Sequence, residues 1–470
     1  MMETWANSGL GRDLHLDLTA SGGGRAQGVR ANLVSALRES VRSGRLVAGT
    51  TLPPSRTLAL DLGIARNTVA EAYAELVAEG WLTARQGSGT RVADRAGEPA
   101  LRPRTRSAAT PRPALSLMPG SPDVGEFPRT AWMTSARRAL TAAPNDAFGP
   151  GDPRGRPELR HALAEYLSRA RGVRTDPDHI VVSASSGHGL WLLARAVKGS
   201  IAVEGYGLHL HRELLGDAGV STVPLHLDNR GAQPPDATGR QLSAALLTPA
   251  HQFPTGGPLH PSRRTAFVEW ARVTGAIVIE DDYDGEFRYD RQPVGALQGL
   301  APDEVAYLGT VSKTLSPAIR VGWMVLPERL IDRVLAVKGG YERWVSSTDQ
   351  LTLADFIESG AFDRHVRRMR TLYRRRRDSL VETLAARAPH VHVTGIAAGL
   401  HAVLELPDGT EAATLDRAAA LGLAVEGLRT FRHPDGPSDR PDGLVVGYST
   451  PSSARFSATL DALCRALPTP

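Results

Sequence analysis

The chain has 470 residues, of which 41% are hydrophobic and 22% charged, as in a soluble globular protein long enough for two or more domains. No apolar run is long enough to span a bilayer, and the N-terminus lacks a signal-peptide pattern. The single cysteine, Cys464, excludes an internal disulfide and a cysteine-based zinc site. These features predict a cytoplasmic protein. The net charge of +5 is modest, so its distribution along the chain is more informative.

Much of the excess positive charge lies near the N-terminus. Residues 25–92 contain nine Arg and five Asp or Glu, a net charge of +4. Three stretches with helical apolar spacing are followed by two short β-type runs, in the order 29–41, 55–62, 67–79, 81–84 and 90–92. This order predicts a winged helix-turn-helix over residues 1–93, mostly α with a β wing. The alternative is a small helical domain with a solvated charged face.

In a winged helix-turn-helix the third helix enters the major groove with its N-terminus first. Asn67 is placed to cap that helix. The same end carries the candidate base-reading residues, Arg66, Asn67 and Thr68. The candidate backbone-contacting residues lie at the start of the second helix and in the wing, at Arg56, Gly87 and Arg91. The predicted partner is double-stranded operator DNA.

The composition changes twice after this segment. Residues 94–115 lack apolar periodicity and are rich in Arg, Pro, Ala and Thr, which predicts a flexible basic linker. Contact of this linker with DNA phosphates is the alternative to a solvated tether. From residue 116 to residue 470 strand-like and helix-like stretches alternate, which predicts an α/β domain with a largely parallel sheet.

Polar groups follow the ends of five predicted strands in this second domain. They are Ser186 and Gly187 after 180–182, Tyr206 after 201–204, His251 after 242–247, Asp281 and Tyr283 after 276–279, and Lys313 after 305–308. Ligands of open α/β sheets bind just outside the carboxyl ends of the strands. The shared position of these groups therefore predicts one binding site.

Lys313 is chemically unusual for this chain, because the only other lysines are Lys198 and Lys338 and every other basic side chain is Arg. Arg stays protonated near neutral pH, whereas a desolvated Lys can lose its proton and condense with an aldehyde. Pyridoxal phosphate (PLP) requires such a lysine, an acid for its pyridinium nitrogen and donors for its phosphate.

The neighbouring residues supply the other groups that PLP requires. Asp281 is the candidate partner of the ring nitrogen, and Tyr283 is the candidate donor to the ring oxygen. The candidate phosphate ligands are Ser186, Gly187, Thr310, Ser312 and Arg320. An N-capping or metal-like cluster of Asp281 and its acidic neighbours is the alternative. His251 does not complete a metal site without further ligands, and no metal is predicted.

Specific motifs relate both parts of the chain to known families. The first part resembles GntR-type regulators through residues 52–56, 60–69 and 86–90. The second part resembles fold-type-I, PLP-dependent aminotransferases through residues 251–256, 279–289 and 308–317. The whole chain therefore resembles MocR/GabR-type transcription regulators. The resemblance implies that Lys313 forms the Schiff base with PLP, that Asp281, Tyr283 and Arg320 hold the ring nitrogen, ring oxygen and phosphate, and that the protein is a domain-swapped homodimer.

One departure from the aminotransferase pattern bears on function. Aminotransferases place an arginine for the substrate carboxylate near the strand that begins at Leu444, where this chain has Asp442-Gly443. Other arginines nearby are candidates for an effector carboxylate, namely Arg429, Arg432 and Arg440. The sequence therefore predicts a DNA-binding transcription regulator that senses an amine, an amino acid or PLP itself. The alternative is an active aminotransferase with a fused DNA-binding module.

Two further hypotheses remain open at this stage. One is a regulator whose second domain has lost the cofactor and only dimerises, which the combination of Lys313, Asp281 and Tyr283 argues against. The other concerns eight arginines between residues 360 and 378, which are expected on one long helix. A solvated or interface-lining helix is the favoured interpretation, and a second DNA contact is the alternative.

Overall fold

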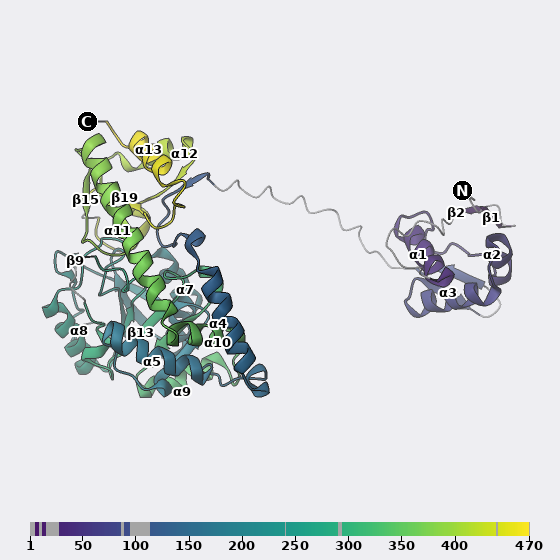
Figure 1. Cartoon of the computed structure of the whole chain (residues 1–470), viewed down its shortest axis with the longest axis horizontal. Helices are drawn as coiled ribbons and strands as arrows, with labels where there is room; N and C mark the ends of the chain where they lie inside the picture. Colours follow the sequence, from purple (N-terminus) through teal and green to yellow (C-terminus); the bar gives the residue numbers. More distant parts are fainter. Residues whose placement is uncertain are drawn as a thin grey trace. The chain divides into compact units, whose positions relative to one another are not determined.

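The computed structural model describes residues 5–8, 12–15, 28–85, 89–94, 113–239, 241–289, 294–438 and 440–469. The chain divides into two compact units, Met1–Pro111 and Arg112–Pro470, which are described separately below (Figure 1). We call them the head and the effector domain. Gly87 and most of the predicted linker lie outside the described residues.

The described residues of the head form three helices and two antiparallel hairpins. Its elements are β1 (Trp5–Ser8), β2 (Arg12–His15), α1 (Val29–Arg42), α2 (Ser55–Leu62), α3 (Arg66–Ala78), β3 (Leu82–Arg85) and β4 (Gly89–Val92). Strands β3 and β4 pair in antiparallel register, as a wing does. Fully buried side chains from all three helices form one core, among them Leu33, Leu58 and Val69. This is the predicted winged helix-turn-helix.

The turn between α2 and α3 differs from the sequence prediction in one detail. Gly63 ends α2 in the left-handed conformation with φ of 66°, which favours glycine. The N-cap of α3 is Ala65, whose carbonyl accepts from the Thr68 amide at 3.0 Å. Asn67, which was predicted as the cap, instead lies within the first helical turn. The α2–α3 turn is so short that Ala65 already holds the extended conformation that a cap requires.

The effector domain is organised around a seven-stranded sheet. Its strands are β6 (Ile180–Ser183), β7 (Ser200–Glu204), β8 (Ser221–Leu225), β11 (Ala244–Leu247), β12 (Ile277–Asp281), β13 (Val305–Thr310) and β14 (Gly322–Val325). Their order is β6-β14-β13-β12-β11-β7-β8, and only β14 runs antiparallel to its neighbours. The sheet is therefore largely parallel, as predicted, and the carboxyl ends of its six parallel strands, which include β7, β11, β12 and β13, share one edge.

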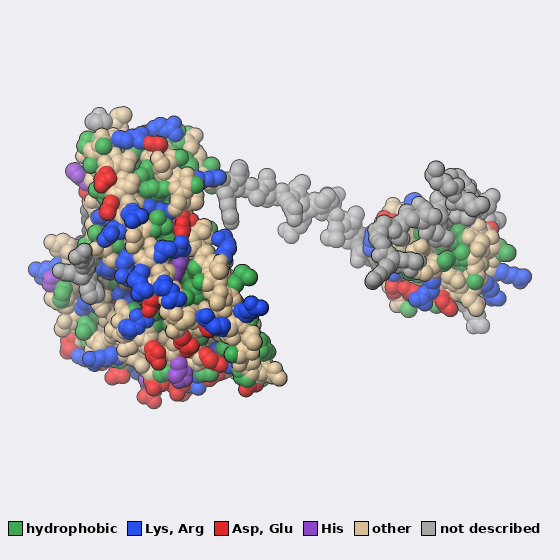
Figure 2. Space-filling model, viewed as in Figure 1, with side chains coloured by type: hydrophobic (Ala, Val, Ile, Leu, Met, Phe, Trp, Pro, Cys, Tyr) green, Lys and Arg blue, Asp and Glu red, His purple; other side chains and the backbone are tan. Residues whose placement is uncertain are grey.

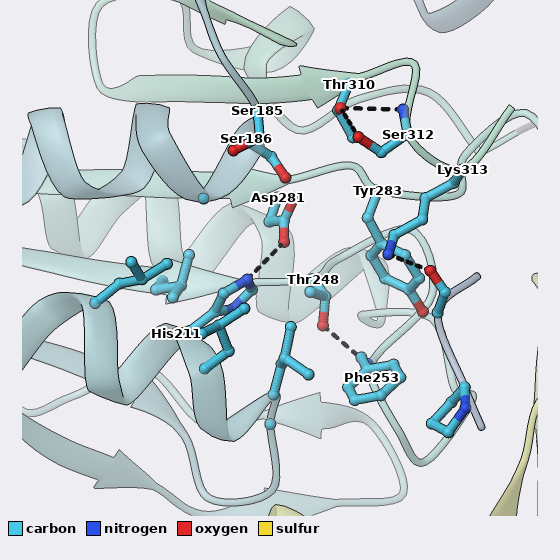
Figure 3. A pocket seen from close by; sticks show the side chains of 18 of the residues that line it. Ser185, Ser186, His211, Thr248, Phe253, Asp281, Tyr283, Thr310, Ser312 and Lys313 are labelled. Carbon is cyan, nitrogen blue, oxygen red and sulfur yellow. Dashed lines mark hydrogen bonds and ion pairs between the residues drawn. The ribbon is translucent and has the colours of Figure 1, made fainter. Parts of the chain in front are cut away.

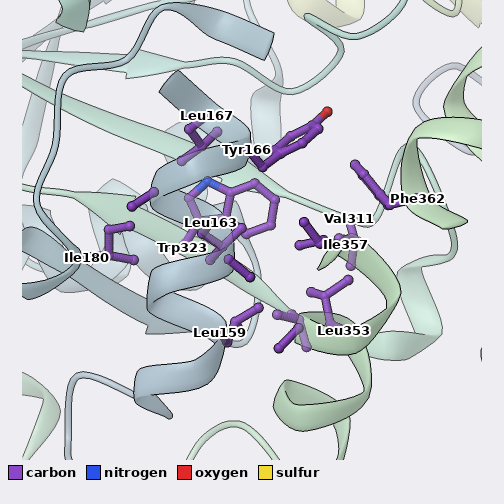
Figure 4. Close-up of a cluster of buried hydrophobic side chains, with 14 of the residues drawn as sticks. Leu159, Leu163, Tyr166, Leu167, Ile180, Val311, Trp323, Leu353, Ile357 and Phe362 are labelled. Carbon is purple, nitrogen blue, oxygen red and sulfur yellow. The ribbon is translucent and has the colours of Figure 1, made fainter. Parts of the chain in front are cut away.

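Helices cover both faces of this sheet (Figure 1). They are α4 (Arg129–Ala142), α5 (Pro157–Arg171), α6 (Ser186–Val197), α7 (His209–Asp217), α8 (Pro261–Thr274), α9 (Glu328–Lys338) and α10 (Ser347–Glu358). Successive strand residues alternate between the two faces. Ile180 packs with α5 and α10 in the cluster of Figure 4, whereas Val181 packs with α6 and α9 in a second cluster. Both faces of the sheet are thus buried, as is usual for a largely parallel sheet covered by helices on both sides.

A smaller lobe completes the effector domain. It contains α11 (Ala361–Arg387), α12 (Glu411–Ala420), α13 (Phe456–Ala466) and a four-stranded sheet in the order β15 (His392–Thr394), β16 (Ala402–Glu405), β19 (Gly443–Val446) and β18 (Glu426–Gly427). Two short strands, β5 (Leu115–Ser116) and β17 (Leu423–Ala424), attach the start of the domain to this lobe, and β9 (Leu227–Asp228) pairs with β10 (Gly231–Ala232). Among the helices that the structure describes, none is long and apolar enough to cross a membrane.

Candidate functional site

A cavity of about 340 Å³ lies at the carboxyl ends of β7, β11, β12 and β13. Eight of the ten residues predicted to bind the cofactor line it, and these are Ser186, Gly187, Asp281, Tyr283, Thr310, Ser312, Lys313 and Arg320. Figure 3 shows Lys313 and Asp281 projecting into this space from the ends of adjacent strands. Tyr206 and His251, the other two, are absent from the lining. The topology thus brings together residues that are more than 130 positions apart.

Lys313 lies in the turn that follows β13, with its amine in the cavity. Its Nζ donates a hydrogen bond to the carbonyl oxygen of Gly120. Desolvation lowers the pKa of Lys313, and the negative charges of Asp281 and Asp284 only partly oppose this shift. A lowered pKa increases the fraction of neutral amine near neutral pH, which is the form that attacks an aldehyde.

Asp281 is the last residue of β12 and is 4% exposed. Burial raises its pKa to about 7, although the nearby Lys313 opposes this rise. Its Oδ2 lies 3.4 Å from Nε2 of His211, whereas its Oδ1 is buried and has no hydrogen-bond partner among the described residues. An unpartnered buried acceptor is costly unless a ligand supplies a donor. A protonated pyridine nitrogen is such a donor.

His211 was not predicted from the sequence. It lies on α7, and burial lowers its pKa to about 4, with a smaller contribution from Lys313. With the pKa of the acid raised to about 7 and that of the imidazole lowered to about 4, the two side chains form a neutral pair between these two pH values. A cationic ring placed against the free Oδ1 would favour the charged form of Asp281 instead.

Two turns at one end of the cavity offer hydroxyl and amide groups. Ser185 caps α6 and accepts from the His188 amide, so the first turn of that helix faces the cavity. Gly322 on β14 allows a close approach here, because a Cβ at this position would lie 2.6 Å from the carbonyl carbon of Ser185. In the second turn, Thr310 Oγ1 donates to Ser312 Oγ at 2.9 Å. Such a set of donors is suited to a phosphate.

His251 lies behind the cavity wall. Its Nδ1 lies 3.1 Å from the Tyr283 hydroxyl and 2.8 Å from Asp284 Oδ2. The Tyr283 hydroxyl also donates to the His251 carbonyl at 3.2 Å. His251 is therefore placed to position Tyr283 rather than to touch a ligand in the cavity.

Two further features near β7 were not anticipated. Glu204, at the end of β7, lines the cavity and accepts from Thr248 Oγ1 at 2.6 Å, and burial raises its pKa to about 7. Tyr206 lies outside the lining, with the guanidinium of Arg440 5.6 Å from its ring centroid. At the end of β7 the cavity is therefore lined by the buried carboxyl group of Glu204 and not, as predicted, by the aromatic ring of Tyr206.

The candidate effector-carboxylate arginines are directed elsewhere. Arg429 forms an ion pair with Asp442 and is 69% exposed. Arg432 donates to the Gly436 carbonyl, and Arg440 lies over Tyr206. None of the three lines the cavity. The cationic side chains that do are Lys313, Arg320 and Arg212, and the last of these donates to the backbone carbonyls of Gly207, Phe431 and Arg432.

Comparison with known proteins relates both units to described families. Residues 30–92 match the family of bacterial regulatory proteins of the gntR type, and residues 117–426 match class I and II aminotransferases. The chain is 34% identical to the pyridoxine biosynthesis transcriptional regulator PdxR of Corynebacterium glutamicum, over 90% of this chain and 92% of that one. It is 35% identical to the probable rhizopine catabolism regulatory protein MocR of Rhizobium meliloti, over 89% of each chain. The chain belongs to the MocR-type transcriptional regulators.

The fold of the effector domain agrees with this assignment. An archaeal alanine:glyoxylate aminotransferase superposes with a TM-score of 0.68 at 22% identity, over 75% of this chain and 90% of that one. The predicted fold class, a winged helix-turn-helix joined to a fold-type-I aminotransferase-like domain, is confirmed. Class I and II aminotransferases depend on PLP. This MocR-type regulator therefore carries the scaffold of a PLP-dependent family.

The gntR-type head is a DNA-binding domain, and its α3 has a polarised surface. Arg66 and Asn67 are exposed at the N-terminal end, and Thr68 is half-buried beside them. The later acidic residues of α3 lie against arginines of α1, with Glu71 and Glu75 near Arg30 and Glu79 paired with Arg38. These contacts offset negative charge that would otherwise repel a DNA backbone. Arg56 on α2 and Arg91 on β4 are also exposed.

Proposed function

We propose that this transcriptional regulator binds PLP through Lys313 and responds to an amine, an amino acid or PLP itself by changing its affinity for operator DNA. One observation carries the proposal. The buried, unpartnered Oδ1 of Asp281 faces the same cavity as the desolvated amine of Lys313. An amine nucleophile and a buried acceptor on adjacent strand ends match the two ends of the PLP ring system better than they match a metal or a nucleotide.

Each end of the cofactor has candidate partners in the cavity. Asp281 would hold the ring nitrogen, and Tyr283 would donate to the ring oxygen. The phosphate ligands would come from Ser186, Gly187, Thr310, Ser312 and Arg320, which provide helix N-terminal amides, hydroxyl groups and one fixed cation. Bound PLP supplies an aldehyde that condenses with amines.

The proton states of the chain's own groups favour this arrangement. Burial lowers the pKa of Lys313, so the amine is available as a nucleophile. A cation at Oδ1 would reverse the rise in the pKa of Asp281, because an opposite charge favours the carboxylate. Cofactor binding and ionisation of Asp281 are therefore expected to be linked.

Sensing requires a path from the cavity to the start of the effector domain, and Gly120 provides one. Its carbonyl accepts from Lys313, and it lies a few residues after β5, where the chain enters the domain. The same segment is held by Thr450, whose hydroxyl donates to the Met118 carbonyl at 2.6 Å. Engaging Lys313 with a ligand would remove one of these attachments, which would bias the segment between two positions.

On the DNA side, the proposal assigns base reading to the start of α3 and backbone contact to α2 and the wing. Arg66, Asn67 and Thr68 would enter the major groove, while Arg56 and Arg91 would contact phosphates. Gly87, which lies between β3 and β4 in the sequence and outside the described residues, would approach the backbone of the duplex. We further propose a domain-swapped homodimer that acts in the cytoplasm, because a dimer presents two heads to a two-fold operator.

The proposal is tested by a visible spectrum of the purified full-length protein, followed by operator binding with and without added PLP and amino acids. The operator is a duplex selected by the protein from a randomised pool. The proposal expects an absorption band from bound cofactor and a ligand-dependent change in operator affinity. A protein that binds the selected duplex but takes up no PLP would refute the sensing mechanism.

An active aminotransferase with a fused DNA-binding module is the second candidate, supported by the same lysine and acid. Transamination requires the carboxylate of the amino-acid substrate to be held so that the α-proton of the substrate faces the lysine. Arg429 is ion-paired outside the cavity, and Arg212 is occupied by three backbone carbonyls. This arrangement favours slow turnover, so the sensing function is preferred.

A further inference from the structure

The outer face of α11 carries an unbalanced positive charge that the functions above do not use. Figure 2 shows Lys and Arg side chains gathered over this helix, whereas many of the acidic side chains in the same view lie along the lower edge of the domain. The exposed arginines of the helix are Arg364, Arg367, Arg368, Arg370, Arg374 and Arg375. Arg376 is different, because it is buried and paired with Asp123.

Several of these side chains have no acidic partner. Arg368 forms an ion pair with Glu126 at 2.9 Å, and Arg370 donates to the Glu286 carbonyl at 2.9 Å. Within the described part of the chain, no ion pair or hydrogen bond engages the guanidinium groups of Arg367, Arg374 and Arg375. Their charges are therefore available to a ligand outside this chain.

The spacing of the arginines gives the charge an extended shape. Arg367 and Arg374 are seven residues apart, which is close to two helical turns, so they lie on the same side of α11. Arg364 and Arg375 mark the ends of the exposed row, and at 1.5 Å per residue they are about 16 Å apart along the axis. One DNA strand presents a phosphate every 3.4 Å of helix axis, so this length corresponds to roughly five phosphates.

A groove of about 580 Å³ continues the basic face at its N-terminal end. It lies between the start of α4 and the start of α11, and it is lined by Arg129, Arg364 and Arg368 together with His365 and Glu126. Arg129 is exposed, and no acidic partner contacts it within the described residues. The groove therefore extends the cationic surface beyond the helix itself.

From this charge and geometry we infer that the outer face of α11 binds the phosphate backbone of the operator DNA, as a second and sequence-independent contact. The occupant follows from charge complementarity, because a row of unpaired guanidinium groups requires a ligand with regularly spaced negative charges. The head holds the same DNA within reach by the covalent link between the two units, so even weak contacts would add to affinity. A second copy of the chain would need an acidic face to cover this row, because burying unpaired guanidinium groups is costly.

The test removes the three unpartnered charges in the full-length protein loaded with PLP. The variant is Arg367→Gln/Arg374→Gln/Arg375→Gln. The matched control, Arg195→Gln/Arg230→Gln/Arg465→Gln, removes three exposed arginines from α6, from the turn after β9 and from α13. Affinity for the selected duplex, extended on both sides, is measured as a function of salt concentration. Affinity decreases with salt, and each phosphate contact contributes about −0.9 to the slope of log affinity against log salt concentration. The slope of the variant should therefore be less negative than that of the wild type by about 2–3 units.

The control should keep the wild-type slope, and Arg367→Lys/Arg374→Lys/Arg375→Lys should retain most of it, because a lysine neutralises a phosphate as a point charge. If the triple Gln variant does not fold, Arg374→Gln alone should still lower the slope by about one unit. Equal slopes for the α11 variant and the control would overturn the inference.

Sedimentation of the same proteins separates DNA contact from self-association. A smaller particle mass for the α11 variant than for the control would assign the face to an interface between copies, and this too would overturn the inference. The inference rests on DNA binding by the head, and the two fail in different ways. If the wild-type protein selects no duplex, the proposed DNA-binding function fails. If it selects one and the slopes agree, only the α11 contact fails.

Discussion

Replacing Asp281 by Asn tests whether the cavity is built for a positively charged ligand. In the ligand-free protein, burial raises the pKa of this carboxyl group from 3.8 to about 7. A folded-state pKa above the unfolded value means that the buried acid favours folding only while it stays protonated. The contribution of the protonated Asp281 carboxyl group to the free energy of unfolding is fully present below the pKa of the unfolded state, and it is lost as the pH rises through the pKa of the folded state. Asn has no proton to lose, so Asp281→Asn should remove this loss.

The size of the effect follows from the two pKa values. Each unit of pKa shift corresponds to 1.36 kcal/mol, so ionised Asp281 costs on the order of 4 kcal/mol at about pH 8. At about pH 5 the cost is roughly 2 kcal/mol, because the native carboxyl is still protonated there. The stability of Asp281→Asn relative to wild type should therefore increase by roughly 2–3 kcal/mol between these two pH values. The unpaired amide of Asn adds a penalty that does not depend on pH, of about 1–3 kcal/mol.

The measurement is denaturant unfolding of the ligand-free full-length protein at several pH values, followed through the transition of the effector domain. Asp332→Asn is the matched control, since Asp332 is exposed on α9 and the same charge is removed. The control should change little with pH relative to wild type. With PLP present, the order should reverse, because Asn cannot pair with a cationic ring nitrogen. A flat difference between Asp281→Asn and wild type over this pH range would refute the argument from burial.

Three further predictions concern the cofactor, the DNA and turnover. Lys313→Ala should abolish the borohydride-reducible attachment of PLP and the visible band while leaving the head able to bind DNA, and the same reducible adduct on this variant would exclude Lys313 as its site. Arg66→Ala should cost about 1–3 kcal/mol of binding free energy on the selected duplex only, because it reads a base. Arg91→Ala should weaken binding to all duplexes and reduce the steepness of the salt dependence by about one unit, because it contacts a phosphate. Equal behaviour of the two variants would contradict this assignment of roles. Keto-acid production from common amino donors should stay near background. Sustained multiple turnover would instead support the alternative function, an active aminotransferase with a fused DNA-binding module.

The sequence predicted the layout of the head and most of the residues that line the cavity because both depend on local patterns. Helical spacing and the Gly63 stop define α2 without tertiary information. Lys313 and Asp281 meet because they follow adjacent parallel strands, and the carboxyl ends of such strands share one edge. For these two residues the position follows from the end of a strand, so the sequence was sufficient to bring them together.

Other residues depend on how helices and loops are oriented, which periodicity does not reveal. His211 reaches Asp281 only because α7 turns its first residues toward the cavity. His251 follows the correct strand, yet the turn directs its ring behind Tyr283. Strand β14 runs antiparallel within an otherwise parallel sheet, and a short apolar run does not indicate direction. Such features are set by packing rather than by sequence spacing.

The same distinction separates α11 from an ordinary solvated helix. The eight arginines between residues 360 and 378 are visible in the sequence, but their environments in the structure differ. Arg376 is buried against Asp123, whereas Arg367 and Arg374 are exposed and have no partner among the described residues. The structure distinguishes the paired arginines from the exposed ones, so the proposed DNA contact is argued from particular residues and not from the charge of the segment.

The last prediction concerns the route from the cavity to the head. Gly120 has φ of +86°, and a Cβ there would lie 3.3 Å from Lys313 Nζ, so the amine and this backbone segment are in direct contact. When the amine engages a ligand, the Gly120 carbonyl loses its donor, while the bond from Thr450 to Met118 remains. Hydrogen exchange in residues 118–122 should therefore increase when PLP binds.

Lys313→Ala should show the faster exchange without any ligand, because the donor is already absent, and PLP should then change nothing further in this segment. Thr450→Val is the comparison, since it removes the remote attachment and leaves the amine in place. It should speed exchange at the start of the segment and still allow a further response to PLP. If exchange in residues 118–122 were the same in wild type with and without PLP, the cavity could not signal through Gly120, and the coupling would have to pass through another element.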